Sequence, residues 1–338
     1  LELGTLADWV AVNAGGSGFF RARYSGEMLE ALSSSMFENL TSIERYGLVD
    51  DTWSSVLAGR TSATEFLDFA RSFQEEIDLD VWAVLSGCLG ALDKLVDGKA
   101  REQYREVIRD LAQPALDQIG WKPAEDDSSR TLELRGLLIR LLANVGDDEL
   151  AQQTARDLHE AYLADAGSVE PNIAAAATGV VASRGSSENY EVFLGKYKNP
   201  ATPQEERRYQ SALSAFPGAA EMRRTLDMTI NGGVRTQDAP YLLVVCLRNR
   251  DQGHLAWRFI KDNWDKINEE FPSNSIVRML SGVTSLNDKE QADDVLAFFG
   301  DHEVSQGQLT LQQTLEKLRV NVALRVRETD RFAEQLTA

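Results

Sequence analysis

The chain has 338 residues, of which 43% are hydrophobic, and its formal net charge at pH 7 is −18. An acidic surface repels the phosphate backbone, so we expect no nucleic acid among the partners. The sequence has no apolar run of about 18 residues and no N-terminal secretory signal, so we expect a cytoplasmic protein that neither spans nor binds a membrane.

The segment before Ser25 predicts a β-hairpin. Residues that favour strands are spread along it: Val10, Val12, Phe20 and Tyr24. Gly15-Gly16 can supply the positive φ angles of a tight turn. The run Gly15-Gly16-Ser17-Gly18 is superficially similar to a phosphate-binding loop, but it lacks the Lys-Ser/Thr ending and no helix follows it, so a turn is the better interpretation. We therefore expect residues 1–25 to form a terminal hairpin and residues 26–338 to form a helical domain.

From residue 26 onward, apolar residues recur three and four positions apart in segments of ordinary helix length. There are about sixteen such segments, and several are too short and too apolar on one face to be stable alone. No fixed repeat period is present. The sequence thus predicts an all-α protein, an irregular α-solenoid of the HEAT or armadillo kind.

Local signals support several boundaries of these helices. Ser62 and Glu65 have capping-box spacing, and Thr202 precedes a proline at the first helical position. The polar stretch Lys122–Ser129 predicts an exposed loop, and it is the one plausible seam between domains.

Residue types that carry catalysis or bind metals are sparse. The three histidines are far apart in the sequence: His159 is expected at a helix surface or half buried, His254 at the start of a helix and His302 in a loop. The HExxH and CxxC spacings of metal sites are missing, as are the Gly-x-Ser-x-Gly and Walker motifs. Cys88 and Cys246 lie in apolar helical segments, which indicates buried free thiols rather than a disulfide. These patterns assign no catalytic residue, no metal ligand and no cofactor to this chain.

Asp50 and Asp51 allow two interpretations. A catalytic pair of carboxylates is conceivable, but neighbouring residues on a helix point in different directions. We prefer an ion-pair or hydrogen-bond network that includes Arg45.

Six segments, in the same order, resemble zinc aminopeptidases of the aminopeptidase N type. VNAGGSGFFRARYS near the start is similar to the family segment that ends a small β-sandwich domain. The others are RYGLVDD, SENYEVFLGKYKNPATPQEERRYQSAL, VRTQD, RNRDQGHLAWRFIKDNWDKI and LQQTLEKLRVNVAL. The chain departs from the family at Ala22, where Val is usual, and at Leu324, where Trp is usual. Over essentially its whole length it resembles the endoplasmic-reticulum-aminopeptidase-like C-terminal helical domain.

This resemblance implies that the hairpin is the last edge of a β-sandwich domain and that zinc is bound by a catalytic domain, both outside this chain. It also implies that the helical domain encloses the peptide substrate beyond its first residue, limits the length of that peptide and moves as a hinged lid. The implied partners are the peptide and the catalytic and β-sandwich domains of the same polypeptide. The chain alone would be a non-catalytic part of the enzyme.

Basic residues on the inner face of such a domain could contact a peptide carboxylate. Arg248 and Arg319 are our candidates for this cavity. Arg248 could instead stabilise a helix C-terminus, and Arg319 could simply be solvated. Two other functions stay open: a stand-alone helical adaptor that binds proteins, and an independent enzyme with an unrecognised site.

Overall fold

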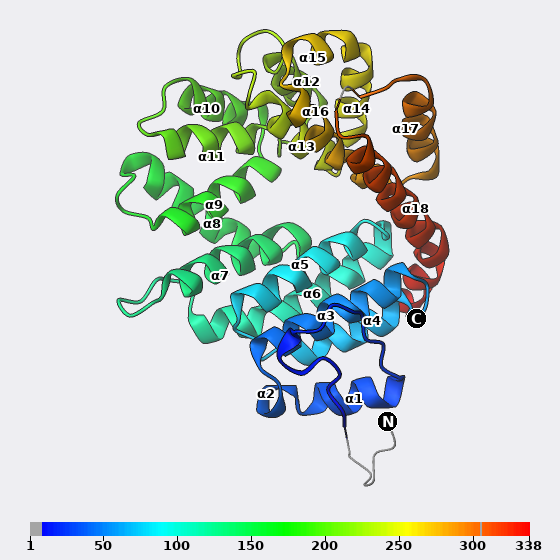
Figure 1. The fold of residues 1–338 in the computed structure, drawn as a ribbon. Coiled ribbons are helices and arrows are strands. Elements are labelled where there is room, and N and C mark those ends of the chain that lie inside the picture. The colour runs from blue at the N-terminus through cyan, green and yellow to red at the C-terminus, as the bar shows by residue number, and fades with distance from the viewer. Residues whose placement is uncertain (1–8, 305) are drawn as a thin grey trace. The chain divides into compact units, whose positions relative to one another are not determined.

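The computed structural model describes residues 9–304 and 306–338, and Figure 1 shows its helices. Within these residues there are eighteen α-helices and no β-strand, which confirms the all-α prediction and slightly exceeds the expected number of helices. The chain forms two compact units: unit 1 comprises Leu1–Thr154, Asp165–Ala176 and Arg327–Ala338, and unit 2 comprises Ala155–Ala164 and Ala177–Val326. No helix in the described residues is both long enough and apolar enough to cross a bilayer.

Unit 1 is built from the first seven α-helices together with parts of three others. The seven are α1 (Gly26–Ser34), α2 (Met36–Asn39), α3 (Ser42–Leu57), α4 (Ala63–Ala70), α5 (Leu79–Asp93), α6 (Gly98–Ile119) and α7 (Ser129–Arg140). Helices α8 (Glu149–Ala164), α9 (Pro171–Ser183) and α18 (Gln308–Thr337) contribute residues to both units. The stretch Lys122–Ser129 is part of unit 1; it follows α6, and its last residue is the first of α7.

The predicted hairpin is wrong for the described part of residues 1–25. The structure has a single 3-10 turn there, η1 (Ala14–Gly16), and otherwise irregular backbone lying against α3 (Figure 1). The backbone N–H of Gly15 donates to Glu44 (2.8 Å), and that of Ala22 donates to Asp51 (3.1 Å). Asn13 adopts a positive φ of 64°, and its side chain accepts from Gly18 N–H at 2.6 Å. Because side chains take these backbone donors, they do not form a ladder between two strands.

The core of unit 1 is mostly aliphatic and contains several packed aromatic rings. Phe69 packs edge-to-face against Phe66 and Phe73, with ring centres 6.1 and 5.2 Å away. Tyr104, fully buried, packs against Phe332 from the end of α18. Cys88 is buried in this unit and Cys246 in unit 2, and both are free thiols, as predicted.

Helix α6 continues through Pro114, which has no N–H to donate to the carbonyl of residue 110. Gln74 replaces that missing donor: its Nε2 lies 3.2 Å from the Asp110 carbonyl oxygen. A side chain outside the helix thus satisfies the acceptor that the proline leaves free.

Unit 2 contains α10 to α17 and the remaining parts of α8, α9 and α18. Its complete helices are α10 (Ser187–Lys198), α11 (Pro203–Leu213), α12 (Ala219–Met228), α13 (Ala239–Arg248), α14 (Gly253–Asp262), α15 (Trp264–Glu270), α16 (Ser273–Met279) and α17 (Lys289–Asp301). One aromatic cluster surrounds Phe193, whose ring centre lies 5.0 Å from those of His159 and Tyr209.

Both caps expected from the sequence are present. Ser62 forms a capping box with Glu65 at the start of α4, and Thr202 accepts from the Glu205 N–H at the start of α11. Local hydrogen-bonding chemistry therefore fixes these boundaries as the residue types predict.

Candidate functional site

The start of α3 is held by a capping box that the sequence analysis overlooked. Glu44 accepts from the backbone N–H and the hydroxyl of Thr41, at 2.8 and 2.7 Å. Its other carboxylate oxygen accepts from the Gly15 N–H. The hydrogen bond from Gly15, followed by those from Thr41, lowers the pKa of Glu44 below its ordinary value.

The start of α5 carries two carboxylates. Asp78 caps the helix, since its Oδ1 accepts from the N–H groups of Asp80 (2.9 Å) and Val81 (3.2 Å). Arg130, on α7, donates from Nη2 to Asp80 at 2.9 Å and lies 3.6 Å from Asp78. The hydrogen bond to Asp80 raises the pKa of Arg130.

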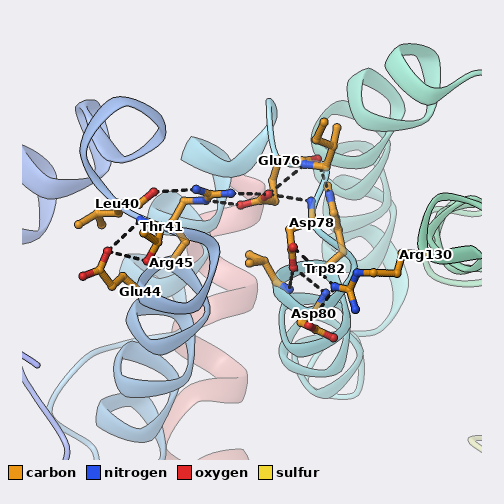
Figure 2. A network of polar contacts seen from close by, with 11 residues as sticks. Leu40, Thr41, Glu44, Arg45, Glu76, Asp78, Asp80, Trp82 and Arg130 are labelled. Atoms are coloured by element: carbon orange, nitrogen blue, oxygen red, sulfur yellow. Dashed lines mark hydrogen bonds and ion pairs between the residues drawn. The ribbon is translucent and has the colours of Figure 1, made fainter. Parts of the chain in front are cut away.

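A buried ion pair joins these two helix starts. Figure 2 shows Arg45 of α3 and Glu76, in the loop before α5, pointing toward each other; their two hydrogen bonds measure 2.7 and 3.0 Å. The Glu76 side chain is 1% exposed and that of Arg45 is 13% exposed. Arg45 also donates to the Leu40 carbonyl at 2.8 Å. The guanidinium of Arg45 therefore links Leu40, just before the start of α3, to the loop that leads into α5.

Glu76 extends the network toward α5. Its Oε1 accepts from the N–H groups of Ile77 and Asp78, and its backbone carbonyl accepts from Trp82 Nε1 at 2.6 Å (Figure 2). A buried carboxylate with this many donors is well satisfied. The network fixes the position of Asp78, and through its cap the first turn of α5.

An open groove of about 550 Å³ lies between α3 and α5 and includes Asp78 of this network in its lining. Its lining is partly apolar and partly acidic: Ser42, Ile43, Tyr46, Asp78, Asp80, Ala83 and Val84. Ile43 is 54% exposed although it is a large apolar residue, and Tyr46 is 36% exposed. Exposed apolar side chains beside carboxylates can hold an extended segment of another chain, but they supply no nucleophile or metal site.

The expected network of Arg45 with Asp50 and Asp51 is wrong. Arg45 pairs with Glu76, whereas Asp50 and Asp51 both bind Arg21 of the N-terminal segment. Arg45 lies at the start of α3, while the two aspartates lie more than one turn further along that helix. Their different directions on the helix separate the two networks.

The histidines are in three different environments. His159 is only 4% exposed, so the expectation of a surface or half-buried position is wrong; its Nε2 lies 3.2 Å from the Tyr209 hydroxyl. Burial, with smaller contributions from Lys196 and Arg208, lowers its pKa to about 4. His302 ends α17 and stacks on Phe298, while His254 is exposed at the start of α14. Among the described residues, no cluster of His, Cys, Asp or Glu could hold a metal ion.

The two arginines proposed for a substrate cavity lie on different helices of unit 2. Arg248 is the exposed last residue of α13. Arg319, on α18, is exposed and lies 3.5 Å from Glu316, one turn earlier. Neither residue lines the groove in unit 1.

Sequence reasoning missed this groove, although the sequence carries signals for the starts of the two helices that line it. Thr41-x-x-Glu44 has the capping-box spacing, and Asp78 stands immediately before the apolar run of α5. The pairing of residues 45 and 76 had no such signal, because it depends on the tertiary fold.

Comparison with known proteins places most of the chain in one family. The family model described as the ERAP1-like C-terminal domain matches residues 9–320. Aminopeptidase M1-B of Oryza sativa subsp. japonica is 28% identical over 325 residues, which cover 93% of this chain and 37% of that protein. Aminopeptidase M1 of Arabidopsis thaliana is also 28% identical, over 93% of this chain and 36% of that protein.

Endoplasmic reticulum aminopeptidase 2 of Bos taurus is 26% identical over 95% of this chain and 35% of its own length. The chain thus spans little more than a third of the length of these relatives. Because the family model covers residues 9–320 out of 338, the chain belongs to the ERAP1-like C-terminal domain family.

Proposed function

We propose that this chain is the substrate-enclosing C-terminal domain of a zinc aminopeptidase, which removes N-terminal residues from peptides. Membership of the ERAP1-like C-terminal domain family carries this proposal. The relatives are aminopeptidases by name, and each is much longer than this chain. In this proposal the domain contacts the peptide beyond its first residue, limits its length and is not catalytic alone.

The residues that the structure describes do not fit a zinc site. The described part offers no cluster of three potential ligands. His159 is packed between Phe193 and Tyr209, and burial raises the pKa of the Cys246 thiol to about 12. We therefore assign zinc to a catalytic domain elsewhere in the same polypeptide and derive no step of the reaction from this chain.

The N-terminal segment supports an interface with a preceding β-sandwich domain. Phe19 is fully exposed, at 108% of its reference area, and Phe20 is 54% exposed. Two adjacent exposed phenylalanines on irregular backbone are candidates for burial against another domain. Arg21 fixes this segment to α3 through Asp50 and Asp51, so it would carry the connection between the two domains.

The groove between α3 and α5 is the candidate peptide contact in unit 1, and Arg248 and Arg319 remain candidates in unit 2. We infer that the helices form an irregular α-solenoid; the packing of α10 against α11 and of α13 against α14 supports this inference. The proposed location is the cytoplasm. An adaptor that binds other proteins is the competing function.

The test is to purify the 338-residue chain and assay it with aminoacyl-anilides and with longer peptides. The expected result is binding of peptides without hydrolysis and without stoichiometric zinc. One equivalent of zinc that survives dialysis, together with activity that persists through repurification, would contradict the proposal.

A further inference from the structure

We propose that Asp80 makes the groove between α3 and α5 selective for a peptide segment in which a basic side chain adjoins an apolar one. This inference rests on the proposed function, because it names the class of peptide that the groove contacts. It concerns residues inside the peptide rather than the residue that is removed.

The apolar part of the ligand would lie on the wall formed by both helices. Ile43 and Tyr46 are one turn apart on α3, and Ala83 and Val84 stand opposite on α5. Ile43 leaves 54% of its area in solvent, and Tyr46 leaves 36%. Covering such a surface with an aliphatic side chain removes apolar area from water, which favours binding.

The negative charge of the residues that line the groove favours a basic side chain in the ligand. Asp78 and Asp80 line the groove, and among the described residues Arg130 is the one cation that binds them, serving both. The side chain of Asp80 is 64% exposed, and only its Oδ2 is bound by Arg130. Within the described residues its Oδ1 accepts no hydrogen bond. A lysine or arginine can pair with this oxygen while its methylene groups lie along the apolar wall.

The same arrangement disfavours an acidic side chain. Asp78 cannot turn away to relieve repulsion, because its Oδ1 caps α5 and its backbone N–H is held by Glu76. A carboxylate brought next to Asp78 and Asp80 meets two charges of its own sign, and that of Asp78 is fixed in place. The groove therefore discriminates by repulsion as well as by attraction.

The test uses the 338-residue chain and three fluorescent peptides, N-acetylated and C-amidated. They are identical and leucine-rich except at one central position, which is Lys, Gln or Glu. We expect the Lys peptide to bind about fivefold more tightly than the Gln peptide and the Glu peptide to bind least, with differences that shrink as NaCl is raised.

Two variants should act in opposite directions. Asp80→Asn should remove the preference for Lys, whereas Arg130→Gln should strengthen it by freeing both carboxylates. Ile43→Ser should weaken binding of all three peptides about equally. The matched control is Asp293→Asn on α17, which makes the same charge change at a side chain that is 60% exposed and should leave the preference intact.

A preference for the Lys peptide that persists in Asp80→Asn would overturn the inference. So would a loss of that preference in Asp293→Asn as large as the loss in Asp80→Asn. Equal binding of the three peptides, weakened by Ile43→Ser, would also overturn it while leaving the proposed peptide-binding function in place. Failure of every peptide to bind would overturn both. Circular dichroism of each variant establishes that it is folded.

Discussion

Arg45 and Glu76, 31 residues apart in the sequence, form a two-bond ion pair in which the carboxylate is 1% exposed. The pair links the start of α3 to the loop before α5, and these two helices line the candidate groove. A contact between residues far apart in the sequence thus joins the two elements that line the groove.

Arg45→Met should destabilise unit 1 by about 3 kcal/mol, because it leaves a buried carboxylate without its cation. The two backbone N–H groups that still donate to Glu76 offset part of the loss. Urea unfolding followed by tryptophan fluorescence measures the change. Arg319→Met, at an exposed pair, is the control and should change stability by less than about 0.5 kcal/mol. A similar small effect for both variants would contradict the structural role of Arg45.

His159→Phe should flatten the dependence of stability on pH between about 6.5 and 4. Burial lowers the pKa of His159 to about 4 in the folded protein. Within this pH range the unfolded chain therefore binds a proton at His159 that the folded chain does not bind. Stability therefore falls as the pH falls through this window, by about 1.4 kcal/mol per pH unit at most. Thermal unfolding of both proteins across this range measures the slopes, and equal slopes would show that His159 is not the group responsible.

Glu44→Gln should loosen the N-terminal segment around Gly15 at neutral pH. In the native chain the pKa of Glu44 is lowered by hydrogen bonds from Gly15 and Thr41, so the stabilisation is present above its unfolded pKa and is lost as pH falls through the folded value. Amide hydrogen exchange of residues 9–25, expressed relative to the intrinsic rate at each pH, should therefore accelerate in acid in the native chain. In the variant it should be fast already and depend less on protonation at position 44. Equal protection in both proteins would contradict a role for Glu44 in holding the segment.

Gln74→Ala should cost about 1 kcal/mol in the native chain but less in a Pro114→Ala background. Gln74 donates to the Asp110 carbonyl that Pro114 leaves without a helical partner, whereas alanine at position 114 can restore the backbone bond. A double-mutant cycle of unfolding free energies measures this coupling. Additive effects would show that Gln74 does not compensate for the proline.

Local sequence patterns predicted the helices, but they did not predict the structure of the segment before α1. Apolar spacing predicted helices such as α4 and α11, and the caps at Ser62 and Thr202 lie where their residue types indicate. Val12 and Phe20 favour strands locally, yet Glu44 and Asp51 of α3 take backbone donors that a hairpin would need. Tertiary hydrogen bonds therefore overrode strand propensity.

The candidate groove could not be predicted for a related reason. Asp78 and Asp80 are visible in the sequence as acids at a helix start, and Ile43 and Tyr46 as two residues one turn apart. Nothing local places these pairs opposite each other. Their juxtaposition follows from the packing of α3 against α5, to which the ion pair between Arg45 and Glu76 contributes in the folded chain.

The size and activity of the native protein test the central claim most directly. An antibody raised against this chain would be used to isolate the protein from its source cells, and its mass and its activity on peptides would be measured with and without a zinc chelator. The account predicts a polypeptide much larger than the 37.5 kDa of this chain, with aminopeptidase activity that the chelator abolishes. A protein of about 37.5 kDa without such activity would contradict it and would favour an adaptor that binds other proteins.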